Sequence, residues 1–259
     1  MGKDRVGMVA AAVTMLSVIP LAAAGPPLAR ASTETAVRSG RVIHYVSLGD
    51  SASISVPSFV DKVATRVGVT LHGKVAITRT FEDGTVAVLA ARIESTPAIR
   101  SAIRAADLIT ITIGVNEIAR AASQIAPNGC GSGDGSACVR RAEKEFERSY
   151  ATLLSELTRL RPASKVAYRL LTSYDLPGVL PAAKGVVLTA SLRAENRFIC
   201  AQVLRRGMKC VDVYAAFNGA DGSRDPRAAG LAVPDGHPSA KGATTIARAI
   251  VATGFAPLR

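Results

Sequence analysis

The sequence contains no tryptophan, and aromatic residues make up only 4 % of its 259 positions. Its three histidines are far apart, and its four cysteines include no C-x-x-C pair, so the ligand spacing typical of a zinc site is missing. Charged residues make up 20 % and hydrophobic residues 48 %, a balance that excludes a disordered chain. We therefore expect a globular domain with a substantial core and with no metal or other cofactor.

Acidic residues are scarce beside basic ones, with 20 Asp and Glu against 32 Lys and Arg and a formal net charge of +12. The basic residues are dispersed and are not interleaved with aromatics, which argues against a nucleic-acid partner. A basic excess of this kind favours anionic surfaces, such as cell-wall polymers or anionic lipid.

The apolar run near the N-terminus, residues 9–21, is shorter than the roughly 20 residues that a membrane span needs. It follows Lys3 and Arg5 and precedes small residues, as in an export signal. We expect residues 1–31 to be a signal peptide and residues 32–259 to form one secreted domain. Removing the first segment, which has three basic residues and one acidic residue, leaves a net charge of +10. The alternative is an uncleaved N-terminal anchor, to which Pro20 and the following alanines are less suited.

An even number of cysteines favours disulfides and an oxidising compartment. Four cysteines allow three connectivities, and the sequence alone does not select one. The short spacings favour local pairing, Cys130 with Cys138 and Cys200 with Cys210.

Segments with the pattern of buried strands alternate with segments of helical periodicity, which predicts a doubly wound parallel sheet in one domain. The predicted strands are 42–48, 69–78, 107–113, 165–171 and 209–213. The predicted helices are 58–67, 86–93, 97–105, 142–160, 188–205 and 240–251.

Three short polar segments lie where a strand ends or where the last helix begins: 49–51 (Gly-Asp-Ser), 114–116 (Gly-Val-Asn) and 235–239 (Asp-Gly-His-Pro-Ser). The carboxyl ends of parallel strands share one edge of the sheet, where open α/β folds keep their sites. Each segment also has a plain structural interpretation, because Ser51 can simply cap a helix and His237 can simply precede one. Their order and placement together favour a common site.

This ordered set resembles the SGNH (GDSL-type) hydrolases, a family of esterases and lipases, over roughly residues 45–250, and the start of the chain resembles secreted actinobacterial members. The resemblance implies a flavodoxin-like three-layer αβα sandwich with a five-stranded parallel sheet. It also implies that Ser51 is the nucleophile and His237 the general base. The implied oxyanion hole combines the backbone N–H groups of Ser51 and Gly84 with the side-chain amide of Asn116.

The chain departs from the family pattern in three places. The residue before Gly84 is acidic where the family has Asn, and Glu117 stands where the family has Asp. The family acid normally precedes the histidine by three residues, a position that Pro234 occupies here. Asp235, two residues before His237, either orients the imidazole or leaves a Ser-His dyad whose ring is held by a backbone carbonyl.

Two further residues have open roles. Asp50 is expected to brace the turn before Ser51, and Tyr174, at the end of the fourth predicted strand, either lines the site or packs in the core.

The resemblance implies a secreted serine esterase or lipase that hydrolyses carboxylic esters through an acyl-serine intermediate. One alternative is a carbohydrate O-acetyl esterase acting on cell-wall or plant polysaccharide. Another is a catalytically degenerate member that binds lipid or glycan without turnover. In each case we expect a monomer whose ligand is a lipid or an acylated glycan.

Overall fold

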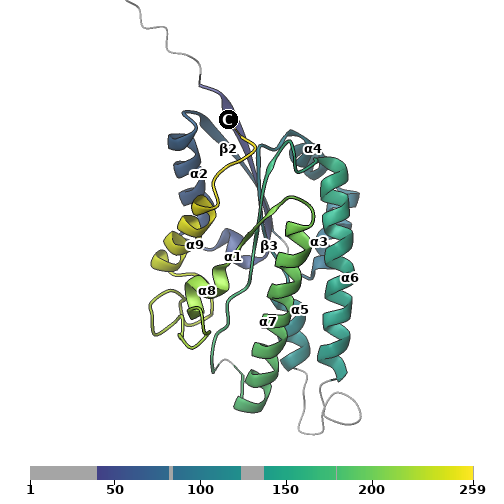
Figure 1. Ribbon diagram of the computed structural model, residues 1–259, viewed down its shortest axis with the longest axis vertical. Coiled ribbons are helices and arrows are strands. Elements are labelled where there is room, and N and C mark those ends of the chain that lie inside the picture. Colours follow the sequence, from purple (N-terminus) through teal and green to yellow (C-terminus); the bar gives the residue numbers. More distant parts are fainter. Residues whose placement is uncertain (1–39, 82–83, 124–136, 179, 259) are drawn as a thin grey trace, which may run out of the picture. The chain divides into compact units, whose positions relative to one another are not determined.

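The computed structural model describes residues 40–81, 84–123, 137–178 and 180–258. Five parallel strands form one sheet in the order β2-β1-β3-β4-β5 (Figure 1). Their bounds are β1 Val42–Gly49, β2 Lys74–Phe81, β3 Leu108–Thr112, β4 Ala167–Leu171 and β5 Lys209–Val211. Each of the five overlaps one of the strands that the sequence predicts.

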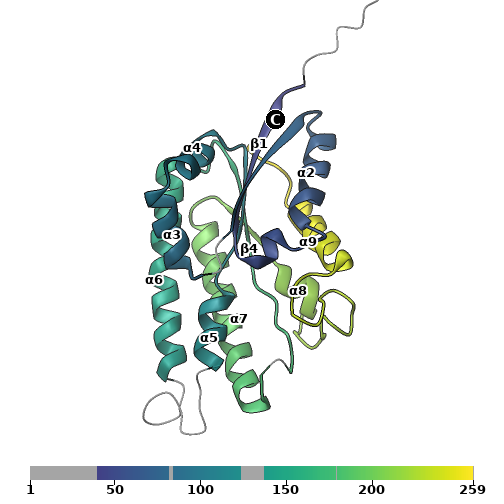
Figure 2. The same ribbon diagram turned by 180° about the vertical axis from the view of Figure 1, so that it is seen from behind.

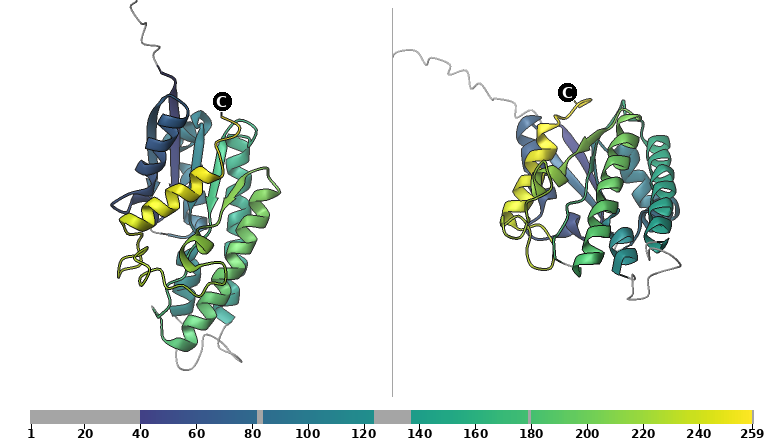
Figure 3. Two further views of the ribbon diagram at one scale, coloured as in Figure 1. Left: turned by 60° about the vertical axis from the view of Figure 1, so that its left-hand side comes forward. Right: turned by 60° about the horizontal axis from the view of Figure 1, so that its bottom comes forward.

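Helices cover both faces of the sheet, as Figures 1 and 2 show from opposite sides and Figure 3 from two further directions. One face carries α2 Phe59–Thr70, α8 Val213–Asn218 and α9 Ala240–Ala252. The other carries α3 Val86–Ser95, α4 Pro97–Ala105, α6 Ala137–Leu160 and α7 Ala182–Leu204. The short helices α1 Ser51–Ile54 and α5 Val115–Ser123 follow directly from β1 and β3. This three-layer arrangement confirms the predicted fold class.

Alternation along the strands explains why the sheet needs helices on both sides. In β1, Val46 and Leu48 belong to the core under α3 and α6, whereas Ile43 and Tyr45 belong to the core under α2 and α9. Successive strand side chains point to opposite faces, so a strand that is apolar at nearly every position must be buried on both.

The sequence prediction misses three short helices and the starts of two longer ones. Helix α1 has four residues and α8 has six, too few for a periodic signal, and α5 lies in a segment that was read only as a turn motif. Helix α7 begins at Ala182 and not at the predicted residue 188, and helix α6 begins at Ala137 and not at the predicted residue 142.

The predicted disulfide between Cys200 and Cys210 is present and ties α7 to β5. The predicted signal peptide, residues 1–31, lies outside the described residues, and so does Cys130, with which Cys138 was expected to pair. Within the described ranges, no helix has the length and apolarity to cross a membrane.

Candidate active site

Ser51 is placed by the close approach of two strand ends. Gly49 pairs with Thr112 on β3, and a Cβ atom at position 49 would overlap the Thr112 carbonyl and hydroxyl oxygens, so only glycine fits there. The next residue, Asp50, donates its N–H to the Thr112 carbonyl at 2.8 Å. The chain then turns directly into α1, whose first residue is Ser51.

Asp50 is the N-cap of α1, as the sequence suggested. Its Oδ1 accepts the N–H of Ala52 at 3.1 Å, and its carbonyl accepts the N–H of Ser53 at 3.0 Å. These bonds occupy two orphan donors of the first helical turn. The N–H of Ser51 has no acceptor among the described residues, which leaves it available to a substrate oxygen.

The carboxyl of Asp50 is only 5 % exposed. Burial raises its pKa to about 6, although the N–H of Ala52 and the charge of His237 act in the opposite direction. The carboxyl group of Asp50, which is next to Ser51 in the sequence, therefore changes its charge in mildly acidic solution.

Asn116 is the second residue of α5 and follows the end of β3. Its Nδ2 donates to the carbonyl of Gly84 at 3.4 Å. The adjacent Glu117 is buried, and its Oε1 accepts the N–H of Val86 at 2.5 Å. Glu117, which stands where the SGNH pattern has aspartate, thus ties the start of α5 to the start of α3.

His237 lies in the turn that an isolated bridge between Ala232 and Pro238 closes, shortly before α9 begins at Ala240. The carbonyl of His237 accepts the N–H of Val233 at 2.9 Å. Gly236, with φ +94°, takes the left-handed conformation that this turn requires.

Asp235 contacts the imidazole although it is only two residues away. Its Oδ1 lies 3.0 Å from His237 Nδ1 and also accepts the backbone N–H of His237 at 3.0 Å. These two hydrogen bonds, the backbone one first, hold the pKa of Asp235 below its ordinary value. A proton on Nδ1 leaves Nε2 as the free base of the ring. Asp235 is 68 % exposed and His237 38 %, so the pair lies in contact with water.

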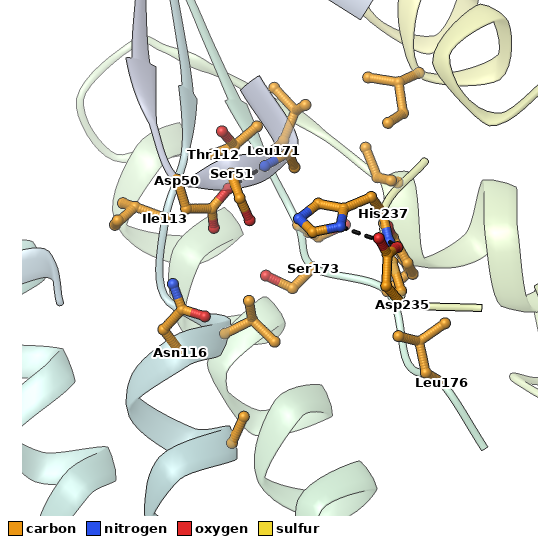
Figure 4. A pocket seen from close by; sticks show the side chains of 18 residues that line it. Asp50, Ser51, Thr112, Ile113, Asn116, Leu171, Ser173, Leu176, Asp235 and His237 are labelled. Carbon is orange, nitrogen blue, oxygen red and sulfur yellow. Dashed lines mark hydrogen bonds and ion pairs between the residues drawn. The ribbon is translucent and has the colours of Figure 1, made fainter. Parts of the chain in front are cut away.

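One pocket of about 350 Å³ brings together Ser51, Asn116, Asp235 and His237. Figure 4 shows the imidazole of His237 turned toward Ser51 on one side and joined to Asp235 on the other. Among the described residues no hydrogen bond joins Ser51 to His237, and such bonds commonly tighten only when substrate binds. Gly84 does not line this pocket; its contact with the site runs through Asn116. The described part of the chain has no cluster of three or more side chains suited to a metal ion.

Tyr174 both lines the pocket and packs, so the two roles that the sequence left open are combined. Its ring stacks on Phe217 with centroids 4.3 Å apart, and its hydroxyl donates to the Gly236 carbonyl at 2.5 Å. Tyr174 therefore anchors the turn that carries His237. Sequence reasoning gave no reason to single out Glu195, which lies in the interior of α7 and is described below.

No protein-family model matches the chain, and a search of curated proteins gives no match. Solved structures do resemble it. One is the lipase Lip_vut3 from a goat rumen metagenome, with a TM-score of 0.70 and 20 % identity over 84 % of this chain and 100 % of that one. Another is a variant of the acetylxylan esterase Axe2 from Geobacillus stearothermophilus, with a TM-score of 0.56 and 21 % identity over 83 % of this chain and 94 % of that one.

The chain thus has the three-layer α/β fold of these two proteins, which is the fold expected of SGNH-type hydrolases. Variants of Axe2 described as catalytic mutants replace a serine, an aspartate and a histidine, the aspartate three residues before the histidine. The present chain keeps the three residue types in one pocket but has the shorter spacing between acid and histidine.

Proposed function

We propose that this protein is a serine hydrolase of carboxylic esters. The observation that carries the proposal is the single pocket lined by Ser51, Asn116 and His237, three residues far apart in sequence. The shared fold with a lipase and an acetylxylan esterase supports it.

In the proposed reaction, Ser51 Oγ attacks the ester carbonyl carbon while His237 Nε2 takes the hydroxyl proton. The negative charge that forms on the carbonyl oxygen is held by the N–H of Ser51 and the carboxamide of Asn116. The protonated imidazole then donates to the leaving alkoxide, which gives the alcohol and an acyl-serine. Water, deprotonated by His237, releases the acid and regenerates Ser51.

The decisive test is hydrolysis of a series of p-nitrophenyl esters by the mature protein and by Ser51→Ala. We expect measurable turnover that falls by at least ~10³-fold in the variant. A serine-directed phosphonate should label the wild type at Ser51. Absence of both turnover and labelling would instead favour the degenerate member that binds lipid or glycan without reaction.

Two hollows meet at the candidate catalytic residues. The pocket already described shares Ser51, Asp235 and His237 with a second hollow of about 350 Å³. Asn116 lines only the first, so the acyl carbonyl and its chain belong there, and the alcohol leaves past His237 into the second. The volume of the first hollow exceeds that of an acetyl group. Much of its lining is apolar, and these residues include Ile113, Val115, Ala119, Leu171, Leu176, Val213 and Ile246.

This arrangement favours esters with an acyl chain longer than acetyl, and therefore the esterase or lipase over the carbohydrate O-acetyl esterase. Ala119→Phe should fill the acyl hollow and lower the ratio of octanoate to acetate kcat/KM by about tenfold or more, the scale of a few lost methylene contacts. Ala240→Phe, in the second hollow, is the matched control and should leave that ratio unchanged. Acetate release from acetylated xylan or peptidoglycan with no turnover of longer esters would favour the O-acetyl esterase.

We also propose that the protein is secreted, acts as a monomer and meets its ester substrate, a lipid or an acylated glycan, at an anionic surface. The Cys200–Cys210 disulfide and the basic composition support this. Detection in culture medium of a chain that begins near residue 32 tests export. Binding to anionic vesicles at low salt, lost at high salt, tests the surface interaction.

A further inference from the structure

The buried carboxyl group of Glu195 lies against Gly114, at the turn that leads to Asn116, the candidate oxyanion residue. Glu195, in the middle of α7, is 3 % exposed. Neither of its carboxyl oxygens has a hydrogen-bond partner among the described residues. An unpartnered buried carboxyl is costly, and the proposed reaction does not use it directly, so its position needs an explanation.

Glu195 packs against the turn that leads to Asn116. A Cβ atom at Gly114 would overlap Glu195 Oε1 and would lie 2.9 Å from Phe146 Cε2, and Gly114 has φ +138°. The side chains of Glu195 on α7 and Phe146 on α6 therefore pack closely against the backbone of this turn, in the space that a side chain at position 114 would take. From the other side, Glu117 holds the same turn through its bond to the Val86 N–H.

We propose that Glu195 is a positioning residue, which fixes the backbone at 114–117 and thereby aims the carboxamide of Asn116 at the reacting carbonyl. The inference rests on the proposed function, because it concerns the same site. An oxyanion donor acts only if it is held close to its productive geometry, and Asn116 lies at the first turn of α5, just after the connection from β3.

The role requires that Glu195 be neutral. Burial raises the pKa of Glu195 well above its ordinary value, and three neighbouring carboxyl groups raise it further. These are Glu117 on α5, Asp50 at the end of β1 and Glu143 on α6. The pKa of Glu117 is itself raised to about 7, mainly by burial, although the Val86 N–H and the charge of Arg120 oppose the shift. Ionisation of Glu195 at alkaline pH would repel these groups and loosen the turn.

The direction in which pH changes the free energy of unfolding follows from the difference between the pKa values of Glu195 in the folded and unfolded chain. Because the folded-state pKa of Glu195 is raised, the unfolded chain loses this proton at a lower pH than the folded chain does. The free energy of unfolding therefore falls as pH rises above the ordinary glutamate pKa. Glu195→Gln keeps the shape and removes the ionisation, so it should unfold at a higher temperature than the wild type at pH 8, by several degrees, and not at pH 4.

The kinetic test compares three variants on the ester that the wild type hydrolyses best. Glu195→Ala should lower kcat by about tenfold or more with KM within about twofold, because the misplaced Asn116 acts on charge that develops only in the transition state. Glu195→Gln should keep the wild-type kcat at pH 7 and should lack the decline of kcat that we expect of the wild type once Glu195 ionises. Ile199→Val, one turn further along α7 and equally buried, is the control for simple loss of core packing and should keep the wild-type kcat and pH profile.

A second measurement does not depend on turnover. In ¹⁵N-labelled protein, the side-chain amide resonances of Asn116, assigned by their loss in Asn116→Asp, should shift or broaden in Glu195→Ala and not in Ile199→Val. The proposal is overturned if these resonances are unchanged in Glu195→Ala, or if Glu195→Gln is impaired as much as Glu195→Ala. Resonance changes in a protein that hydrolyses no ester would sink the proposed function and leave the positioning role standing.

Discussion

The two halves of the candidate site are held in different ways. Ser51 and Asn116 follow the ends of β1 and β3, which are paired in register up to Gly49 and Thr112. His237 lies on a turn outside the sheet, and its partner Asp235 is largely exposed. The proposed nucleophile and oxyanion donor therefore take their positions from the buried sheet, whereas the proposed base takes its position from a surface turn. Damage to the first half should cost more than damage to the second.

The largest effect in this comparison is expected from Asn116→Ala. Loss of one oxyanion donor typically lowers kcat by ~10²–10³-fold with little change in KM, because the donor acts on charge that develops in the transition state. Steady-state kinetics on a soluble ester measure this. A fall in kcat/KM that comes from KM alone would remove Asn116 from the oxyanion hole.

A smaller effect is expected from Asp235→Ala. A buried triad acid is worth ~10⁴ in kcat, but an exposed carboxylate is screened by water and salt, so we expect a loss of about tenfold to a hundredfold. The loss should shrink when the wild type and the variant are compared at high salt. Asp221→Ala, another exposed carboxylate in a turn, is the control. A wild-type rate in Asp235→Ala would identify a Ser-His dyad.

The pH dependence of the free energy of unfolding tests whether Asp50, in the half of the site that the sheet holds, is buried as the structure shows. Its folded-state pKa is raised to about 6, so the unfolded chain gives up this proton first, and the free energy of unfolding falls as pH rises from about 4 to 6. In Asp50→Asn, which retains a capping side chain, the contribution of Asp50 to this decline should be lost, so the slope should become shallower, and kcat should fall only a few-fold at pH 8, since the carboxylate no longer faces the imidazolium. Urea unfolding at pH 4, 5, 6 and 7 measures the slope. An unchanged slope would mean that Asp50 titrates normally.

The smallest effect is expected from Tyr174→Phe. The variant keeps the stacking on Phe217 and loses the hydrogen bond to the Gly236 carbonyl, so the free energy of unfolding should fall by about 1 kcal/mol. The turn that carries His237 should become looser, and kcat should fall a few-fold. Thermal unfolding and kinetics on the same preparation test both expectations. A kcat loss as large as that of Asn116→Ala would show that this turn is as tightly constrained as the sheet edge.

The sequence was informative about the strands because each is a short apolar segment ended by a turn. The same logic found Ser51 and Asn116, which follow such segments directly. It misplaced the start of α7 because residues 175–185 contain Pro and Gly, and it gave no indication of α1 or α5, which are too short or too polar to show a period.

The sequence did not predict the contacts between residues that are distant along the chain. Nothing local indicates that Tyr174 reaches Gly236, that Glu117 bonds to Val86, or that Glu195 lies against Gly114. The sequence left open whether Asp235 contacts His237, and only the structure shows that the left-handed Gly236 between them brings Oδ1 to the ring.

The sequence by itself predicted the number of strands and their positions along the chain. It also predicted that the polar segments lie at one edge of the sheet, and it supplied the residue types that acyl transfer needs. The tertiary structure decided which carboxyl groups are buried and which meet water. Burial depends on the packing of helices from distant parts of the chain, and burial is what sets the charge of Asp50 and Glu195.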